Sequence, residues 1–214
     1  ESQWDISSKY DVWVMDLEKQ RLQKVGSPVT GRPLLSPAGN YTIWWDGIQQ
    51  QWFAYDNREQ TTRNLTGEIP VNFWNEKNDV PSSPAPYGLA AWGEEDAWLL
   101  LYDAFDIWKI DPSGETDAVN ITRGVGRRDS LTFRYINTDR EKRFIEKEEQ
   151  LLFSVFDNKS KERGYDTLSQ KGRDPLKRRV MEGFNFSSLV KAKERDLYLF
   201  EKSNFHTPPD LHMT

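Results

Sequence analysis

The sequence contains no cysteine and only two histidines among its 214 residues. The absence of cysteine excludes a disulfide framework and thiolate chemistry. No apolar run approaches the 18 or more residues that a transmembrane helix needs. Basic residues are also outnumbered, because 29 Lys and Arg stand against 34 Asp and Glu and leave a net charge of -5. Without a basic surplus to neutralise phosphates, general nucleic-acid binding is not expected.

Catalytic motifs are also missing. The nucleophile elbow of hydrolases requires Gly-x-Ser-x-Gly, and the sequence does not contain it. A Ser–His–Asp triad would have to use His206 or His212, both close to the C-terminus. These two histidines, with Asp210 between them, lack the helical spacing or cysteine partners of a typical zinc site. We interpret them as surface residues and predict no catalytic, cofactor-binding or metal-binding residue in this chain.

Aromatic residues, in contrast, are abundant, with nine Trp and 13% aromatic residues overall. Such residues favour twisted, half-buried sheets. The apolar run Ala97–Asp103 predicts a strand buried on both faces, and Asp106–Asp111 alternates apolar and charged residues as a second strand. Pro112-Ser113-Gly114 forms a turn, because proline presets φ and glycine tolerates positive φ. Ala118–Thr122 then predicts a returning third strand.

The same pattern recurs elsewhere in the chain. A strand that ends in Asp appears three times, and two of the returning strands end in nearly the same letters. The first set is Val12–Asp16, Trp52–Asp56 and Ile107–Asp111, and the second is Arg63–Thr66 and Val119–Thr122. A further pair of strands precedes each later copy. Four short strands in each unit of roughly 40–55 residues are typical of β-propeller blades.

The predicted fold is therefore all-β: a partial β-propeller of antiparallel four-stranded blades, within one segment spanning residues 1–214. We expect about three full blades plus partial blades at both ends, with apolar, uncovered end faces through which the segment could self-associate. The predicted blades lie near 11–25 (partial), 31–66, 85–122, 130–181 and 187–214 (partial).

Two connections are unusually long. Residues 67–86 form a Pro-rich loop that contains Phe73 and Trp74, and loops of this length are uncommon unless they are functional or packed on themselves. Residues 139–150 are highly charged, and we favour a solvated loop between strands over a short helix. If the chain is a binding module, we expect ligand contact at Phe73 and Trp74.

Several residue groups could carry chemistry but have simpler structural interpretations. The carboxylate pairs Glu94-Glu95 and Glu148-Glu149 lie in predicted turns and are interpreted as solvated. Residues 124–128 resemble part of a phosphate-binding turn, but they lack the third glycine and the βαβ setting. We interpret Asp103, Asp106 and Asp111 as turn-capping residues and not as calcium ligands. Six tryptophans are interpreted as sheet core: Trp44, Trp45, Trp52, Trp92, Trp98 and Trp108.

Parts of the sequence resemble one protein family. Leu35–Tyr41 is similar to the "SPDGK" strand turn of propellers in the prolyl oligopeptidase and dipeptidyl peptidase IV family of serine peptidases. Residues 60–122 carry the more specific similarity, through Arg63–Thr66, Pro86–Trp92 and Ile107–Asp111. Together these segments resemble the N-terminal propeller of large bacterial exported members of that family.

The resemblance implies a non-catalytic propeller that gates or shapes the access of peptide substrates to a hydrolase domain absent from this chain. It implies a C-terminal α/β-hydrolase domain of the same parent chain as partner, and a periplasmic or secreted location. The sequence shows no signal peptide at its N-terminus, which a mature or trimmed start would also explain. The alternatives are a stand-alone propeller that binds a protein or glycan, and a propeller glycosidase with carboxylates converging near its axis.

Overall fold

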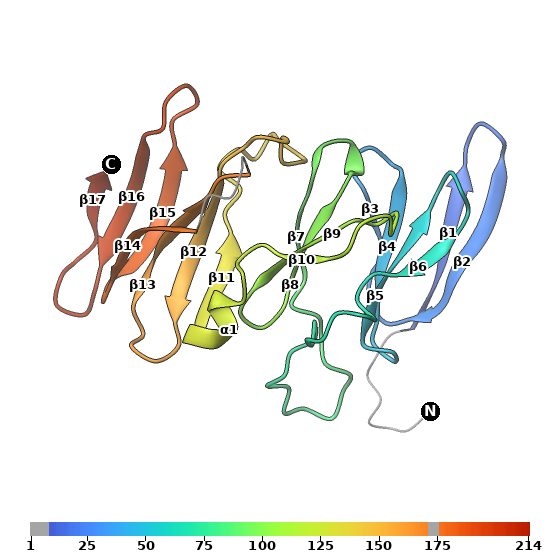
Figure 1. Cartoon of the computed structure of the whole chain (residues 1–214), viewed down its shortest axis with the longest axis horizontal. Helices are drawn as coiled ribbons and strands as arrows, with labels where there is room; N and C mark the ends of the chain where they lie inside the picture. Colours follow the sequence, from blue (N-terminus) through green and yellow to red (C-terminus); the bar gives the residue numbers. More distant parts are fainter. Residues whose placement is uncertain (1–8, 171–175) are drawn as a thin grey trace. The chain divides into compact units, whose positions relative to one another are not determined.

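A computed structural model of the chain describes residues 9–170 and 176–214 (Figure 1). These residues form seventeen β-strands, one five-residue α-helix and one 3-10 turn. Every strand pairing among them is antiparallel. The prediction of an all-β chain is therefore confirmed. No described helix is long and apolar enough to cross a membrane.

The strands of the N-terminal half form one hairpin, β1-β2, and two four-stranded meanders, β3-β4-β5-β6 and β7-β8-β9-β10 (Figure 1). Their bounds are β1 Tyr10–Asp16, β2 Arg21–Val29, β3 Leu34–Leu35, β4 Tyr41–Asp46, β5 Gln51–Asp56, β6 Thr62–Asn64, β7 Leu89–Trp92, β8 Leu99–Tyr102, β9 Ile107–Ile110 and β10 Val119–Asn120. The 3-10 turn Glu94–Asp96 joins β7 to β8.

The C-terminal half contains a four-stranded meander, β11-β12-β13-β14, and a three-stranded sheet, β15-β16-β17. Their bounds are β11 Leu131–Tyr135, β12 Leu151–Asp157, β13 Arg163–Leu168, β14 Lys177–Glu182, β15 Asn185–Lys191, β16 Tyr198–Ser203 and β17 Asp210–Met213, with helix α1 Val125–Asp129 before β11. Each predicted four-stranded segment thus corresponds to one antiparallel meander.

The chain divides into two compact units. The first holds the residues up to Ala104 together with Trp108–Asn120, and the second holds Phe105–Ile107 together with Ile121–Thr214. Each unit brings sheets together around apolar side chains of its own.

In the first unit, sheet β3–β6 is apolar on both faces. The adjacent Trp44 and Trp45, each 3% exposed, point to opposite faces because side chains alternate along a strand. Trp44 stacks on Phe53 and packs with the β1-β2 hairpin through Val12. Trp45 meets Trp52 edge-to-face and packs toward sheet β7–β10. The predicted core role of these tryptophans is confirmed.

Of the remaining predicted core tryptophans, two are buried and one is only partly buried. Trp92 and Trp98 are buried, whereas Trp108 is only partly buried and its indole N–H donates to Asp103 at 2.9 Å. Trp13, at the position equivalent to Phe53 and Trp108, is 52% exposed. The first hairpin therefore exposes large apolar side chains, among them Trp13 and Met15.

The recurring sequence has a repeated hydrogen-bond pattern. The hydroxyl of Thr66 accepts from Trp52 N–H, and that of Thr122 accepts from Ile107 N–H. The preceding residues, Leu65 and Ile121, donate their N–H groups to the carbonyls of the same two partners. The final Thr of each repeat therefore joins the fourth strand to the start of the third.

The predicted strand-end turns are also confirmed. Asp16 and Asp56 each accept hydrogen bonds from the backbone N–H groups two and three residues further on. Asp111 accepts from Ser113 N–H, and Gly114 closes that turn with a φ of 73°. The left-handed conformation explains why glycine stands at this position.

The long loop of residues 67–86 packs on itself and on the core. Phe73 is 2% exposed and meets Trp108 edge-to-face, and the partly buried Trp74 forms an isolated bridge with Pro86. The expectation that Phe73 contacts a ligand is therefore wrong, because its ring is enclosed by the apolar cluster of the first unit.

Candidate functional site

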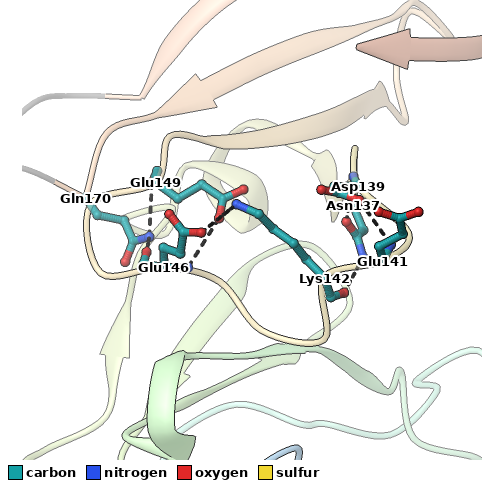
Figure 2. A network of polar contacts seen from close by, with 7 residues as sticks. All are labelled: Asn137, Asp139, Glu141, Lys142, Glu146, Glu149 and Gln170. Atoms are coloured by element: carbon teal, nitrogen blue, oxygen red, sulfur yellow. Dashed lines mark hydrogen bonds and ion pairs between the residues drawn. The ribbon is translucent and has the colours of Figure 1, made fainter. Parts of the chain in front are cut away.

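The carboxylate pair Glu148-Glu149 lies in the charged loop of residues 139–150, which contains turns and no helix, as predicted. Figure 2 shows Lys142 between two carboxylates, 2.9 Å from Glu146 and 3.5 Å from Glu149. The hydrogen bond that Lys142 donates to Glu146 raises the pKa of Lys142, burial opposes this effect, and the negative charge of Glu149 adds to the rise. Gln170 closes the loop by donating to the carbonyls of Glu146 and Glu149. These contacts hold the loop together, and Glu149 is engaged within it.

The carboxylate pair Glu94-Glu95 is exposed in the 3-10 turn, as predicted for a turn. The next residue, Asp96, is 1% exposed and binds the turn after β3. Its carboxylate accepts from Ser36 Oγ at 2.5 Å, Ala38 N at 3.0 Å and Asn40 N at 3.1 Å. Asp96 therefore links two neighbouring sheets of the first unit, and the sequence analysis did not identify it.

The glycine-rich segment of residues 124–128 forms the start of α1. Its amide groups at Gly126 and Arg127 each donate at 2.9 Å to the carboxylate of Asp106, which is 1% exposed. The hydroxyl of Thr122 donates to the same carboxylate at 2.5 Å. An internal carboxylate thus occupies these amide groups. The expectation that Asp106 caps a strand-end turn is wrong, because its carboxylate binds residues 16 to 21 positions further along the chain.

The two histidines are not joined in one site. His206 is exposed beside Phe205, whereas His212 on β17 stacks on Phe200 at 5.8 Å. Within residues 9–170 and 176–214, no group of three or more His, Asp or Glu side chains is placed to hold a metal ion.

The second unit contains a feature that the sequence analysis missed. A cavity of about 830 Å³ lies between one face of sheet β11–β14 and strand β15. The strand register places two rows of side chains on that face. One row is Thr132, Phe156 and Arg163, and the other is Arg134, Ser154 and Tyr165. We call this cavity the arginine cleft.

The charge of the arginine cleft has one sign. Arg134, Arg140 and Arg163 line it, and no Asp or Glu does so among the described residues. The guanidinium of Arg163 lies 4.9 Å from the centre of the Phe156 ring, and Arg134 donates to Phe133 O at 2.6 Å. Burial raises the pKa of Tyr165, so its phenol remains protonated at neutral pH. The cleft therefore offers cations, hydroxyl donors and aromatic surface.

The opposite wall of the cleft is strand β15. Five consecutive residues of this strand, residues 186–190, line the cavity. Since alternate residues face opposite sides of a strand, the cavity borders the edge of β15 as well as one face. A β-bulge interrupts the strand at Ser188, whose φ is 54°. Its hydroxyl donates to Glu201 at 2.9 Å.

A sequence signal for the arginine cleft was present but weak. The alternation Thr132, Arg134 along β11 puts polar residues on one face, while Leu131 and Phe133 lie buried on the other. Polar alternation normally indicates a solvent-exposed face. The register with Phe156 and Tyr165, which turns this face into a cleft, cannot be read from β11 alone.

Comparison with known proteins does not assign the chain to a family. No protein-family model matches it, and no curated protein is significantly similar to it.

Proposed function

We propose that this chain is the non-catalytic β-propeller portion of a larger, exported serine peptidase of the prolyl oligopeptidase family, in which it gates or shapes the access of peptides to a hydrolase domain. The observation that carries the proposal is the repeated four-stranded meander. Successive meanders, each with the same strand order, are the units from which propellers are built.

The packing within the first unit supports the same proposal. Sheet β3–β6 buries one face against the β1-β2 hairpin and the other against sheet β7–β10. Burial of both faces of one sheet by its neighbours is the packing expected of a propeller blade. The exposed apolar side chains of β1, including Trp13 and Met15, provide a surface for a further packing partner, either the rest of a parent chain or a second copy.

The chemistry of the described residues supports a non-catalytic role. Asp96 and Asp106, the buried carboxylates described above, are occupied by hydroxyl and backbone donors. The histidines lie apart from these carboxylates in the hydrogen-bond pattern, so none of these groups forms the nucleophile, base and orienting acid of a triad.

The experiment is a comparison of two proteins. The first is the 214-residue chain, and the second is the product of the complete reading frame that encodes it. Both are treated with a serine-directed fluorophosphonate and with chromogenic dipeptides that end in Pro or Ala. We expect the longer product alone to be labelled and active. Labelling of the 214-residue chain, or a reading frame that encodes no hydrolase domain, would refute the proposal.

A stand-alone binding module is the second candidate, and the arginine cleft is the observation that favours it. A cleft of this size lies within the range of about 300–1,000 Å³ that is usual for ligand sites. This candidate predicts that the 214-residue chain binds a ligand without a hydrolase domain.

A further inference from the structure

We propose that the arginine cleft binds an acidic peptide segment in an extended conformation. The carboxylates of the segment would contact the arginines, and its backbone would lie along the edge of β15. The proposal concerns this chain's own residues, and it does not depend on whether a hydrolase domain follows.

The first argument is charge. The chain as a whole is acidic, with a net charge of -5, yet the described lining of this cavity contains three arginines and no carboxylate. Arg140 and Arg163 have no carboxylate partner among the described residues. The guanidinium groups of Arg140 and Arg163 at one cavity favour an anion, and their planar donor arrangement matches a carboxylate.

The second argument is the contrast with an ordinary interface between sheets. Next to the cleft, Tyr165 meets Phe186 and Phe200 edge-to-face, and these contacts hold the two sheets of the second unit together. Beyond this contact, the sheets do not close onto a packed core but leave about 830 Å³ lined by polar, aromatic and aliphatic groups. The cleft is open to solvent on one side and combines charged, hydroxyl and apolar lining residues, as ligand sites usually do.

The third argument concerns the shape of the ligand. Strand β15 is an edge strand, since its sheet has the order β15-β16-β17. Among the described residues, no strand pairs with its outer edge. Extended peptides add to such edges through backbone hydrogen bonds, while side-chain pockets give specificity. The consecutive lining residues 186–190 place that edge beside the arginines, which favours a peptide over a compact anion.

The experiment is calorimetric titration of the 214-residue chain with matched probes. The acidic probe is acetyl-Phe-Glu-Glu-Phe-amide, and the neutral control is acetyl-Phe-Gln-Gln-Phe-amide. We expect the acidic peptide to bind about tenfold or more tightly than the neutral one, and its affinity to fall as salt is added. Inorganic phosphate tests whether a compact anion is sufficient for binding. A peptide methylated at both Glu amide nitrogens tests whether backbone hydrogen bonds to β15 are needed. Both should bind more weakly than the acidic peptide.

Variants of the chain locate the site. Arg140→Gln is the principal variant, because this exposed side chain forms no hydrogen bond or ion pair with another described residue and its loss should not affect folding. It should weaken acidic-peptide binding about tenfold, as should Arg163→Gln. Arg195→Gln, an exposed arginine in the β15–β16 turn of the same unit, makes the same change of charge outside the cleft and should bind like the parent.

Three results would overturn the proposal. One is equal binding of the acidic and neutral peptides, or no binding of either peptide. Another is an equal loss of affinity in Arg140→Gln and Arg195→Gln, which would indicate only a general charge effect. The third is binding of phosphate or of the methylated peptide as tightly as the acidic peptide, which would contradict an extended peptide on β15.

Discussion

Sheets β3–β6 and β11–β14 have the same strand order, but their faces differ. The first carries buried aromatic side chains on both faces, through Trp44 and Trp45. The second buries Phe133 and Phe153 on one face, while its other face carries Arg134 and the arginine cleft. A meander of this kind requires only one apolar face to fold against a neighbour. The other face can therefore accept polar residues and become a binding surface.

The cross-strand side-chain pairs account for the difference between the two sheets. In sheet β3–β6 the cross-strand pairs Trp44 with Phe53 and Trp45 with Trp52 fill the space to the next sheets. In sheet β11–β14, Arg134 on the first strand stands opposite Ser154 on the second, and Ser154 stands opposite Tyr165 on the third. Side chains of this polarity do not fill an interface between sheets, so the cavity remains open.

The sharpest test of the contrast is truncation of one large side chain in each sheet. Trp45→Ala should lower the free energy of unfolding by about 3–5 kcal/mol, because it leaves a cavity in a closed core. Phe156→Ala should cost only about 1 kcal/mol, since the half-buried ring lies on the open cleft and mainly loses its contact with Arg163.

Urea denaturation measures both variants. All nine tryptophans lie at or before position 108, so tryptophan fluorescence follows the first unit, while far-UV circular dichroism also follows the second. Equal losses in the two variants would show that the cleft face is as tightly packed as the core, and would contradict the distinction drawn between the sheets.

How far the sequence predicted this fold depends on the kind of signal. The repeated sequence segments Trp52–Asp56 and Ile107–Asp111 located the third strands of the first two meanders, because hydrophobic alternation and turn residues are local signals. The adjacent Trp44 and Trp45 also indicated burial of both faces.

Features that depend on long-range contacts were not predicted. Phe73 lies in a Pro-rich loop and carries no strand pattern, yet it enters the core. Asp96 follows two exposed glutamates, and nothing local shows that it binds residues almost sixty positions earlier in the chain. The arginine cleft likewise arises from three strands and β15 together, so single-strand patterns do not show it.

The two buried aspartates provide a second comparison between the units. Asp96→Ala should destabilise the first unit by about 3 kcal/mol, because it leaves Ser36 and two backbone amides without their acceptor in a buried setting. Asp106→Ala should cost the second unit a similar amount through Thr122, Gly126 and Arg127. Fluorescence and circular dichroism distinguish the units. Exposed Glu94→Ala serves as the control, and a loss as large as that of Asp96→Ala would contradict the assignment.

A smaller effect is expected for the repeated threonines. Thr66→Val and Thr122→Val keep the side-chain shape but remove the hydroxyl that accepts from the third strand. Each should lower the free energy of unfolding by about 1–2 kcal/mol, because a buried backbone N–H loses its acceptor and the oxygen to which the hydroxyl donates, on Gln51 or Asp106, loses a donor. The two losses should be similar if the repeat is structural, as measured by urea denaturation. A loss at only one of the two sites would show that the shared sequence does not have a shared role.

The smallest effect concerns pH and the strand-end turns. Burial acts to raise the pKa of Asp111, but hydrogen bonds from Ser113 and Thr116 outweigh it, and the pKa is lowered. The backbone amides of Lys159 and Ser160 lower the pKa of Asp157. A carboxyl whose pKa is lower in the folded state stabilises the fold above its unfolded pKa of about 3.9, and this contribution is lost as pH falls through the folded value. The Tm should therefore fall between pH 5 and pH 3. Asp111→Asn, which can still accept the turn's hydrogen bonds, should show a smaller fall, whereas an unchanged pH dependence would show that this aspartate has the same pKa in both states.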